Sequence, residues 1–185
     1  PKVHRIEKFL EYCVGKSVLN VGMGGYIDDA DQTEAWKKSG LKNTLHFRAV
    51  KVSNKVTGID INQYALDSMA EIYPGEYICA NVMETTFGDK ASGNFDVILF
   101  GEVLKHHDNF ALALSNLRNI LKDDGIIIIS TPNAFAIDRI FKIFFSYEAV
   151  HLEHTFYFSY LTLKHKTSDI FLRLWSTIFH NFRKD

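Results

Sequence analysis

The sequence has few cysteines, no long apolar run and no excess of charge, and each absence excludes a class of protein. Only two cysteines, Cys13 and Cys79, occur among its 185 residues, too few for a disulfide framework or a zinc-binding signature. A reducing, cytoplasmic location is therefore expected. The longest apolar runs fall far short of the ~20 residues that a membrane-spanning helix needs, so we expect no transmembrane segment.

The formal net charge is −1 at pH 7 with neutral histidines, which gives no sign of a nucleic-acid partner. Internal repeats, low-complexity tracts and interdomain linkers are also missing. Because the length suits one domain, we expect a single domain over residues 1–185. Its core is predicted at 15–133, followed by a phenylalanine-rich, mostly helical part at 134–185. No signal peptide is visible in this stretch, which begins at Pro1 rather than at a methionine.

What the chain does contain is an alternation of helical and extended segments. Apolar residues at helical spacing predict helices over 3–14, 63–73 and 109–121. Short apolar runs predict strands at Ser17–Val21, Lys55–Asp60, Glu76–Cys79, Asn94–Phe100 and Ile126–Ser130. Strands that are apolar on both faces and separated by helices are typical of a parallel sheet covered on both sides. We therefore expect an α/β fold with a doubly wound, mostly parallel sheet.

Three stretches complete this prediction. Residues 41–52 can supply a crossover helix, which leaves 26–40 as an insertion or loop. Residues 122–125 are expected to turn between a helix and the last strand. The apolar positions of 134–147 predict a helix whose apolar side faces the core. Alternatively, that side forms a wall of a substrate pocket, or a surface that meets lipid or a protein partner.

The residues that follow the strands matter most, because open parallel sheets bind ligands at the carboxyl ends of their strands. The first strand runs into Gly22-Met23-Gly24-Gly25, where backbone N–H groups can approach a ligand closely. The alternative is a tight turn with no ligand. A P-loop is excluded because no Gly-Lys-Ser/Thr follows, and a dinucleotide-binding loop is disfavoured because Ile27 stands where its third glycine belongs.

Two polar residues at neighbouring strand ends narrow the choice of ligand. Asp60 can accept hydrogen bonds from both hydroxyls of a ribose, or it can cap the helix at 63–73. Asn81 can pair with the edge of an adenine, or it can be a turn residue. With the glycine loop, these side chains indicate a site for an adenosine that carries a small anionic group.

In their order and spacing, these segments resemble the class I S-adenosylmethionine-dependent methyltransferases. The similar segments, within about residues 15–133, are Val18–Gly24, Val56–Asp60, Phe95–Leu104 and Leu121–Pro132. The resemblance implies a Rossmann-like fold, S-adenosylmethionine as cofactor, and methyl transfer to a small-molecule or glycan acceptor, with oxygen as the expected atom. It also implies a cofactor site: Gly22 and Gly24 beside the methionine moiety, Asp60 on the ribose, Asn81 and Val82 around the adenine, and Gly101 and Glu102 near the methyl group.

The chain departs from the family pattern at several positions, among them Gly25-Tyr26 at the last step of the glycine motif. Asn20 stands where the family usually has an acid. Lys105 interrupts the Glu-x-x-Glu-His segment of the branch that contains ubiquinone-type O-methyltransferases and sugar methyltransferases, so we expect no metal. An NAD-dependent oxidoreductase and a non-catalytic methyltransferase-like binding subunit remain alternatives.

Histidines are the candidates for catalysis. His106 and His154 are the leading candidates for a general base and His107 is a weaker one, because a neutral imidazole can accept a proton near pH 7. Each of them can instead be a surface or structural histidine.

Overall fold

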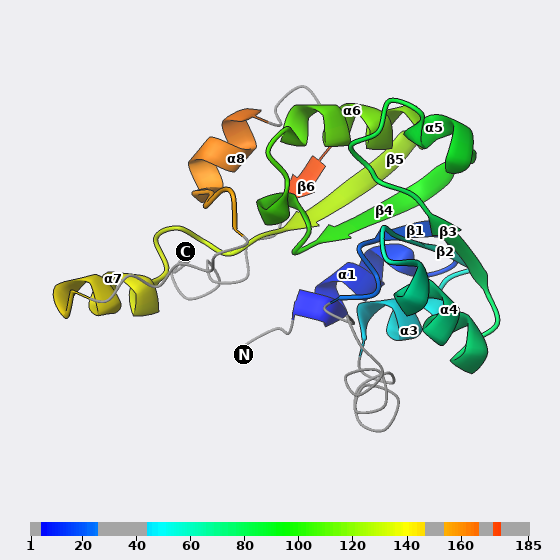
Figure 1. Ribbon diagram of the computed structural model, residues 1–185, viewed down its shortest axis with the longest axis horizontal. Coiled ribbons are helices and arrows are strands. Elements are labelled where there is room, and N and C mark those ends of the chain that lie inside the picture. The colour runs from blue at the N-terminus through cyan, green and yellow to red at the C-terminus, as the bar shows by residue number, and fades with distance from the viewer. Residues whose placement is uncertain (1–4, 26–43, 147–153, 167–171, 175–185) are drawn as a thin grey trace.

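The computed structural model describes residues 5–25, 44–146, 154–166 and 172–174. These residues form a six-stranded sheet with the order β3-β2-β1-β4-β5-β6, in which every neighbouring pair is parallel (Figure 1). The strands are β1 (Ser17–Val21), β2 (Lys55–Asp60), β3 (Glu76–Cys79), β4 (Phe95–Gly101), β5 (Leu121–Ser130) and β6 (Leu172–Leu174). The predicted α/β fold with a doubly wound parallel sheet is confirmed.

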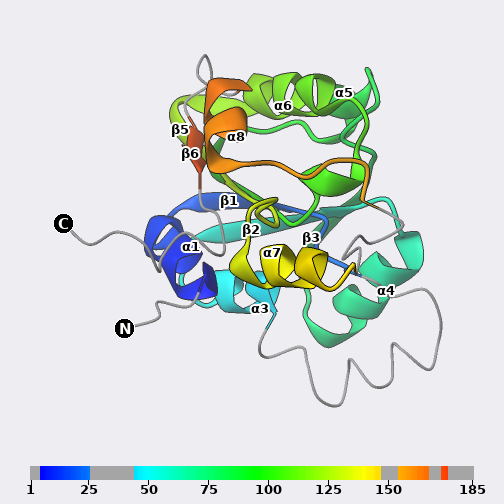
Figure 2. The ribbon, with the colours of Figure 1, turned by 90° about the vertical axis from the view of Figure 1, so that its left-hand side faces the viewer.

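Helices cover both faces of this sheet (Figure 2). On one face lie α1 (Arg5–Cys13), α3 (Leu45–Val50) and α4 (Gln63–Ile72), and on the other lie α5 (Phe87–Lys90), α6 (Phe110–Asn119) and α8 (Tyr160–Lys166). A 3₁₀ turn, η2 (Leu104–His106), follows β4, and α7 (Ile137–Phe144) follows β5. No helix in these parts of the chain is long and apolar enough to span a membrane.

The strands alternate their side chains between two apolar clusters, as their period of two residues requires. Val18 and Leu99 pack with Phe9 of α1 in the cluster on one face. Leu19 and Ile98, their chain neighbours, belong to the cluster on the other face. Burial on both faces explains why these strands read as nearly continuous apolar runs in the sequence.

Short polar side chains begin three of the helices. Thr44, Asn62 and Asn109 each accept a hydrogen bond from a backbone N–H three residues on, at 3.2 Å, and so cap α3, α4 and α6. Asn62, rather than Asp60, therefore caps the helix after β2.

The predicted turn at 122–125 was wrong, because β5 already begins at Leu121. Phe95 of β4 pairs with Leu121 and Val97 pairs with Ile126, so the extra residues of β5 are taken up by a shift of register. Burial of Leu121, which is 5% exposed, holds this end of the strand against the sheet.

The part after residue 133 differs from expectation in two ways. A short strand, β6, pairs with β5 in a region expected to be mostly helical. The prediction that the apolar side of α7 faces the core was also wrong, since Phe141 and Phe144 are 62% and 79% exposed. The physical reason is that α7 extends beyond the end of β5, where no sheet lies beneath it (Figure 1). The predicted insertion at 26–40 lies outside the described residues.

Candidate functional site

A cavity of about 570 Å³ opens where β1, β2 and β4 end. This volume lies within the range of about 300–1,000 Å³ that is usual for small-molecule sites. The cavity brings together residues that were predicted from separate strand ends: Gly22, Asp60, Asn81, Val82, Gly101, Glu102 and His106. Gly24 and His154 are not part of its wall, although each supports a residue that is.

The glycine loop is folded tightly onto its neighbours. Gly22 adopts φ +70° and lies so close to the side chain of Val103 that a Cβ atom would clash with it. Its N–H donates to the carbonyl of Ile59 at 2.8 Å. The N–H of Gly24 donates to Oδ2 of Asp60, also at 2.8 Å. The loop therefore orients the acid of the next strand.

Asp60 is 8% exposed and lines the cavity. Its Oδ1 accepts from the N–H of Asn62 at 3.0 Å, so backbone donors hold both carboxylate oxygens. Because each oxygen can accept more than one hydrogen bond, the fixed carboxylate keeps acceptor capacity for a ligand hydroxyl pair.

Asn81 closes a turn and also lines the cavity. Its Oδ1 accepts from the N–H of Met83 at 2.9 Å, which closes the turn after β3. Within the described residues its amide nitrogen has no hydrogen-bond partner, and that nitrogen is a donor available to a ligand. Asn116 of α6 donates to the carbonyl of Val82 at 2.8 Å and fixes the turn from behind.

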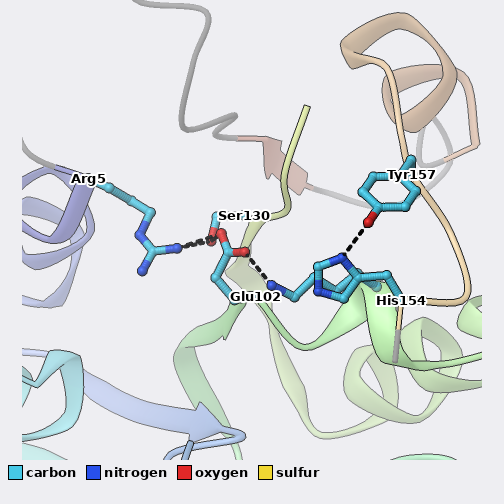
Figure 3. A network of polar contacts seen from close by, with 6 residues as sticks. Arg5, Glu102, Ser130, His154 and Tyr157 are labelled. Carbon is cyan, nitrogen blue, oxygen red and sulfur yellow. Dashed lines mark hydrogen bonds and ion pairs between the residues drawn. The ribbon is translucent and has the colours of Figure 1, made fainter. Parts of the chain in front are cut away.

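Glu102 is held between two cations (Figure 3). Arg5 of α1 donates to its Oε1 at 2.5 Å, and Lys105 donates to its Oε2 at 3.0 Å. Ser130, at the end of β5, donates to the same Oε1 at 3.1 Å. Glu102 has φ +63°, a conformation that costs a non-glycine residue about 1–3 kcal/mol and persists only where the surroundings fix it.

A chain of aromatic contacts leads from the cavity to His154. The rings of His106 and His154 meet nearly perpendicularly, with centroids 5.2 Å apart. Nδ1 of His154 lies 3.0 Å from the hydroxyl of Tyr157 (Figure 3), and the guanidinium of Arg139 lies 4.3 Å over the Tyr157 ring. The N–H of Thr155 donates to the carbonyl of Lys105 at 2.8 Å, which attaches this segment to the 3₁₀ turn.

His107 also lines the cavity, and its ring stacks on Phe100 with centroids 6.4 Å apart. Burial is the main cause that lowers the pKa of His107, and the nearby charge of His106 lowers it further. The neutral form of the ring is therefore favoured.

Two sequence matches show which proteins this chain is similar to. A family model described as a methyltransferase domain matches residues 40–129. A ubiquinone biosynthesis O-methyltransferase from Actinobacillus pleuropneumoniae serotype 7 is 29% identical over 126 residues, which are 64% of this chain and 47% of that protein. Both matches support a resemblance of this chain to the class I S-adenosylmethionine-dependent methyltransferases. The chain spans about half the length of this curated relative.

Solved structures share the methyltransferase fold at low sequence identity. A protein of Bacillus halodurans assigned as a methyltransferase has a TM-score of 0.61 and 16% identity, and the match covers 89% of this chain and 67% of that one. TehB from Haemophilus influenzae has a TM-score of 0.60 and 13% identity, with 90% and 50% covered. YcgJ from Bacillus subtilis has a TM-score of 0.57 and 14% identity, with 89% and 66% covered. These likenesses concern the fold.

Asn20, which departs from the methyltransferase pattern, lies beside His46, a residue that the sequence did not point to. The amide nitrogen of Asn20 lies 3.4 Å from Nδ1 of His46, and both residues line the cavity. His46 is 2% exposed, and burial lowers its pKa to about 4. A neutral pair therefore occupies the place of the usual acid. No sequence signal identifies His46, which lies within the crossover helix predicted at 41–52.

Arg5 is the second residue that the sequence did not reveal. It lies 97 positions from Glu102 in the chain, and only the packing of α1 against the sheet brings them together. Its place at the start of an amphipathic helix gave no hint of a site.

Proposed function

We propose that this chain transfers a methyl group from S-adenosylmethionine to an oxygen atom of a small-molecule or glycan acceptor. The observation that carries the proposal is the arrangement of the cavity: a fixed carboxylate at the end of β2, an amide at the end of β3, and a charged cluster at the end of β4. Each suits one part of the cofactor. The likeness to an O-methyltransferase supports oxygen as the acceptor atom.

The residues present fit the cofactor. Asp60, held by two backbone donors, would accept from the ribose hydroxyls. Asn81 and Val82 would lie against the adenine. The guanidinium of Arg5 would hold the methionine carboxylate, because a planar fork of donors suits a carboxylate. When bound, the cofactor supplies an electrophilic methyl group on a positively charged sulfur.

The chain itself has two tasks in such a reaction, which are to position the acceptor and to remove its proton. His106 is the proposed general base, because it lines the cavity and a neutral imidazole nitrogen is a proton acceptor. His154 lies behind it and is held by Tyr157. We assign His154 as a positioning residue that keeps the His106 ring turned toward the acceptor.

Calorimetric titration of the purified chain with S-adenosylmethionine and with S-adenosylhomocysteine tests the proposal. Saturable binding of both at one site is expected, followed by methyl transfer to at least one hydroxyl compound in an acceptor panel. Absence of binding by a folded sample would defeat the proposal. Competition by NAD would favour an oxidoreductase, and cofactor binding without turnover across the panel would favour a binding subunit.

A further inference from the structure

The end of the cavity beside β4 carries more positive than negative charge. Arg5 and Lys105 each bind one oxygen of Glu102, so two cations share a single carboxylate. In the part of the chain that the structure describes, Asp60 is the other acid of the cavity wall, and it lies across β1, at the end of β2. The side chain of Lys105 is only 12% exposed, so solvent screens its charge weakly.

Both cations keep donors that the described residues do not use. In these parts of the chain Arg5 donates only to Glu102 and Ser130, and Lys105 donates only to Glu102. A guanidinium has five N–H donors and an ammonium has three. Partly buried donors of this kind are stabilised by an acceptor, and most strongly by an anionic one.

Charge balance favours an anion more strongly once the cofactor is bound. Among the described residues, the charged side chains that line the cavity are Arg5, Lys105, Asp60 and Glu102, and their charges cancel. S-adenosylmethionine has a sulfonium, an ammonium and a carboxylate, so it adds one positive charge. The neutral pair in the cavity wall, Asn20 with His46, does not offset this charge. The loaded cavity is therefore one negative charge short of neutrality, which attracts an anionic partner.

We propose that the acceptor carries an anionic group, a carboxylate or a phosphate, and that Lys105 binds this group beside Glu102. The inference rests on the proposed function. Lys105 directly precedes His106 in the 3₁₀ turn, and both residues line the cavity. An anion on Lys105 therefore brings a neighbouring hydroxyl of the same molecule near the proposed base. Lys105 acts in specificity, and the proton passes to His106.

The probe is inorganic phosphate, titrated by calorimetry into the protein saturated with S-adenosylmethionine, which carries the sulfonium charge, at constant ionic strength. One saturable site is expected. Lys105→Met should weaken phosphate binding by about tenfold or more, as expected for loss of a charge-assisted hydrogen bond. Lys105→Arg, which keeps the charge, should restore most of the affinity.

Lys122→Met is the matched control. Lys122 also pairs with a carboxylate, that of Asp96 at 2.7 Å, but it lies at the start of β5, outside the cavity wall. Its loss should leave phosphate binding unchanged. Thermal unfolding of each variant checks that the chain remains folded.

Two outcomes overturn the assignment of an anionic acceptor. One is the absence of saturable phosphate binding, or binding that Lys105→Met does not change. The other is phosphate binding to the free protein that S-adenosylhomocysteine abolishes, since the anion site would then belong to the cofactor carboxylate. Failure of S-adenosylhomocysteine to bind would defeat the proposed function. In that case, titration of phosphate into the free protein and into Lys105→Met still shows whether Lys105 binds an anion.

Discussion

The backbone N–H of Gly24 donates to Oδ2 of Asp60 at 2.8 Å, which links the loop after β1 to the acid after β2. A glycine is needed there, because a Cβ atom at position 24 would lie 2.6 Å from Cβ of Ala65 and 3.1 Å from that same Oδ2. The loop and α4 thus enclose the carboxylate from two sides. The glycine-rich motif serves the candidate site by fixing a side chain as well as by lining the cavity.

Gly24→Ala should therefore weaken binding of S-adenosylmethionine. The added methyl group must displace Asp60 or α4, and we expect the dissociation constant to rise by about tenfold, since ~1.4 kcal/mol corresponds to a factor of ten. Calorimetric titration measures the change. Gly88→Ala is the control, because a Cβ atom at Gly88 meets nothing within 4 Å. Equal binding by both variants would show that the contact with Asp60 is unimportant.

Asp60→Ala tests the carboxylate itself. Its loss should raise the dissociation constant for S-adenosylmethionine more than tenfold, because each charge-assisted hydrogen bond contributes roughly 1.5–3 kcal/mol. Asp60→Asn keeps the shape but loses the charge, and should give an intermediate value. Asp123→Ala removes an exposed acid of β5 and should bind normally. Normal binding by Asp60→Ala would mean that the ribose lies elsewhere.

The sequence predicted the strand ends because their signals are local. Apolar runs that stop at a glycine loop or at an acid mark both the strand and its carboxyl end, as at Gly22 and Asp60. Parallel pairing then brings residues from separate strands to one edge without any further information. The cavity walls at Val82 and Glu102 follow from the same rule.

The remaining features depend on contacts between distant parts of the chain. Arg5 reaches Glu102 only through the docking of α1, and His46 reaches Asn20 only after α3 has packed under β1 and β2. Helical periodicity shows that one side of α7 is apolar, but it does not say what lies beside Phe144. The register shift of β5 opposite Phe95 was predicted as a turn. Polar residues interrupt an apolar run both at a turn and at an irregular part of a strand, so the sequence alone does not separate the two.

Burial of His46 predicts a pH dependence of stability. Its pKa is about 4 in the folded protein, and an unfolded histidine has a pKa of about 6.5. Between these values the unfolded chain binds a proton that the folded chain does not, so stability falls as the pH is lowered from 6.5 toward 4. The slope from this residue should be about 1.4 kcal/mol per pH unit. Urea unfolding across this pH window measures it.

His46→Gln keeps a polar group beside Asn20 but removes the titration. The pH dependence of its stability should be weaker than that of the unsubstituted chain, by the slope that corresponds to the uptake of about one proton on unfolding. His107, whose pKa is also lowered by burial, contributes slope of the same sign to both proteins, so the difference isolates His46. Identical slopes would show that His46 is protonated as easily in the folded state as in the unfolded one.

The histidine pair makes a prediction about the rate of methyl transfer. His106→Asn should lower kcat by about 10²–10⁴-fold, the usual contribution of a general base, with a smaller change in KM for the acceptor. Tyr157→Phe removes the hydroxyl that holds His154 and should lower kcat less, because the base itself remains. Single-turnover assays with a methyl-labelled cofactor separate the chemical step from product release.

The pH profile distinguishes a base from a structural histidine. In the unsubstituted chain, kcat should rise with pH as the base loses its proton, and this rise should vanish in His106→Asn. In Tyr157→Phe the rise should remain but shift, because the tyrosine acts on His106 only through His154. His165→Asn alters an exposed histidine of α8 and should leave the profile intact. An unchanged profile in His106→Asn would assign proton removal to another group, or to solvent.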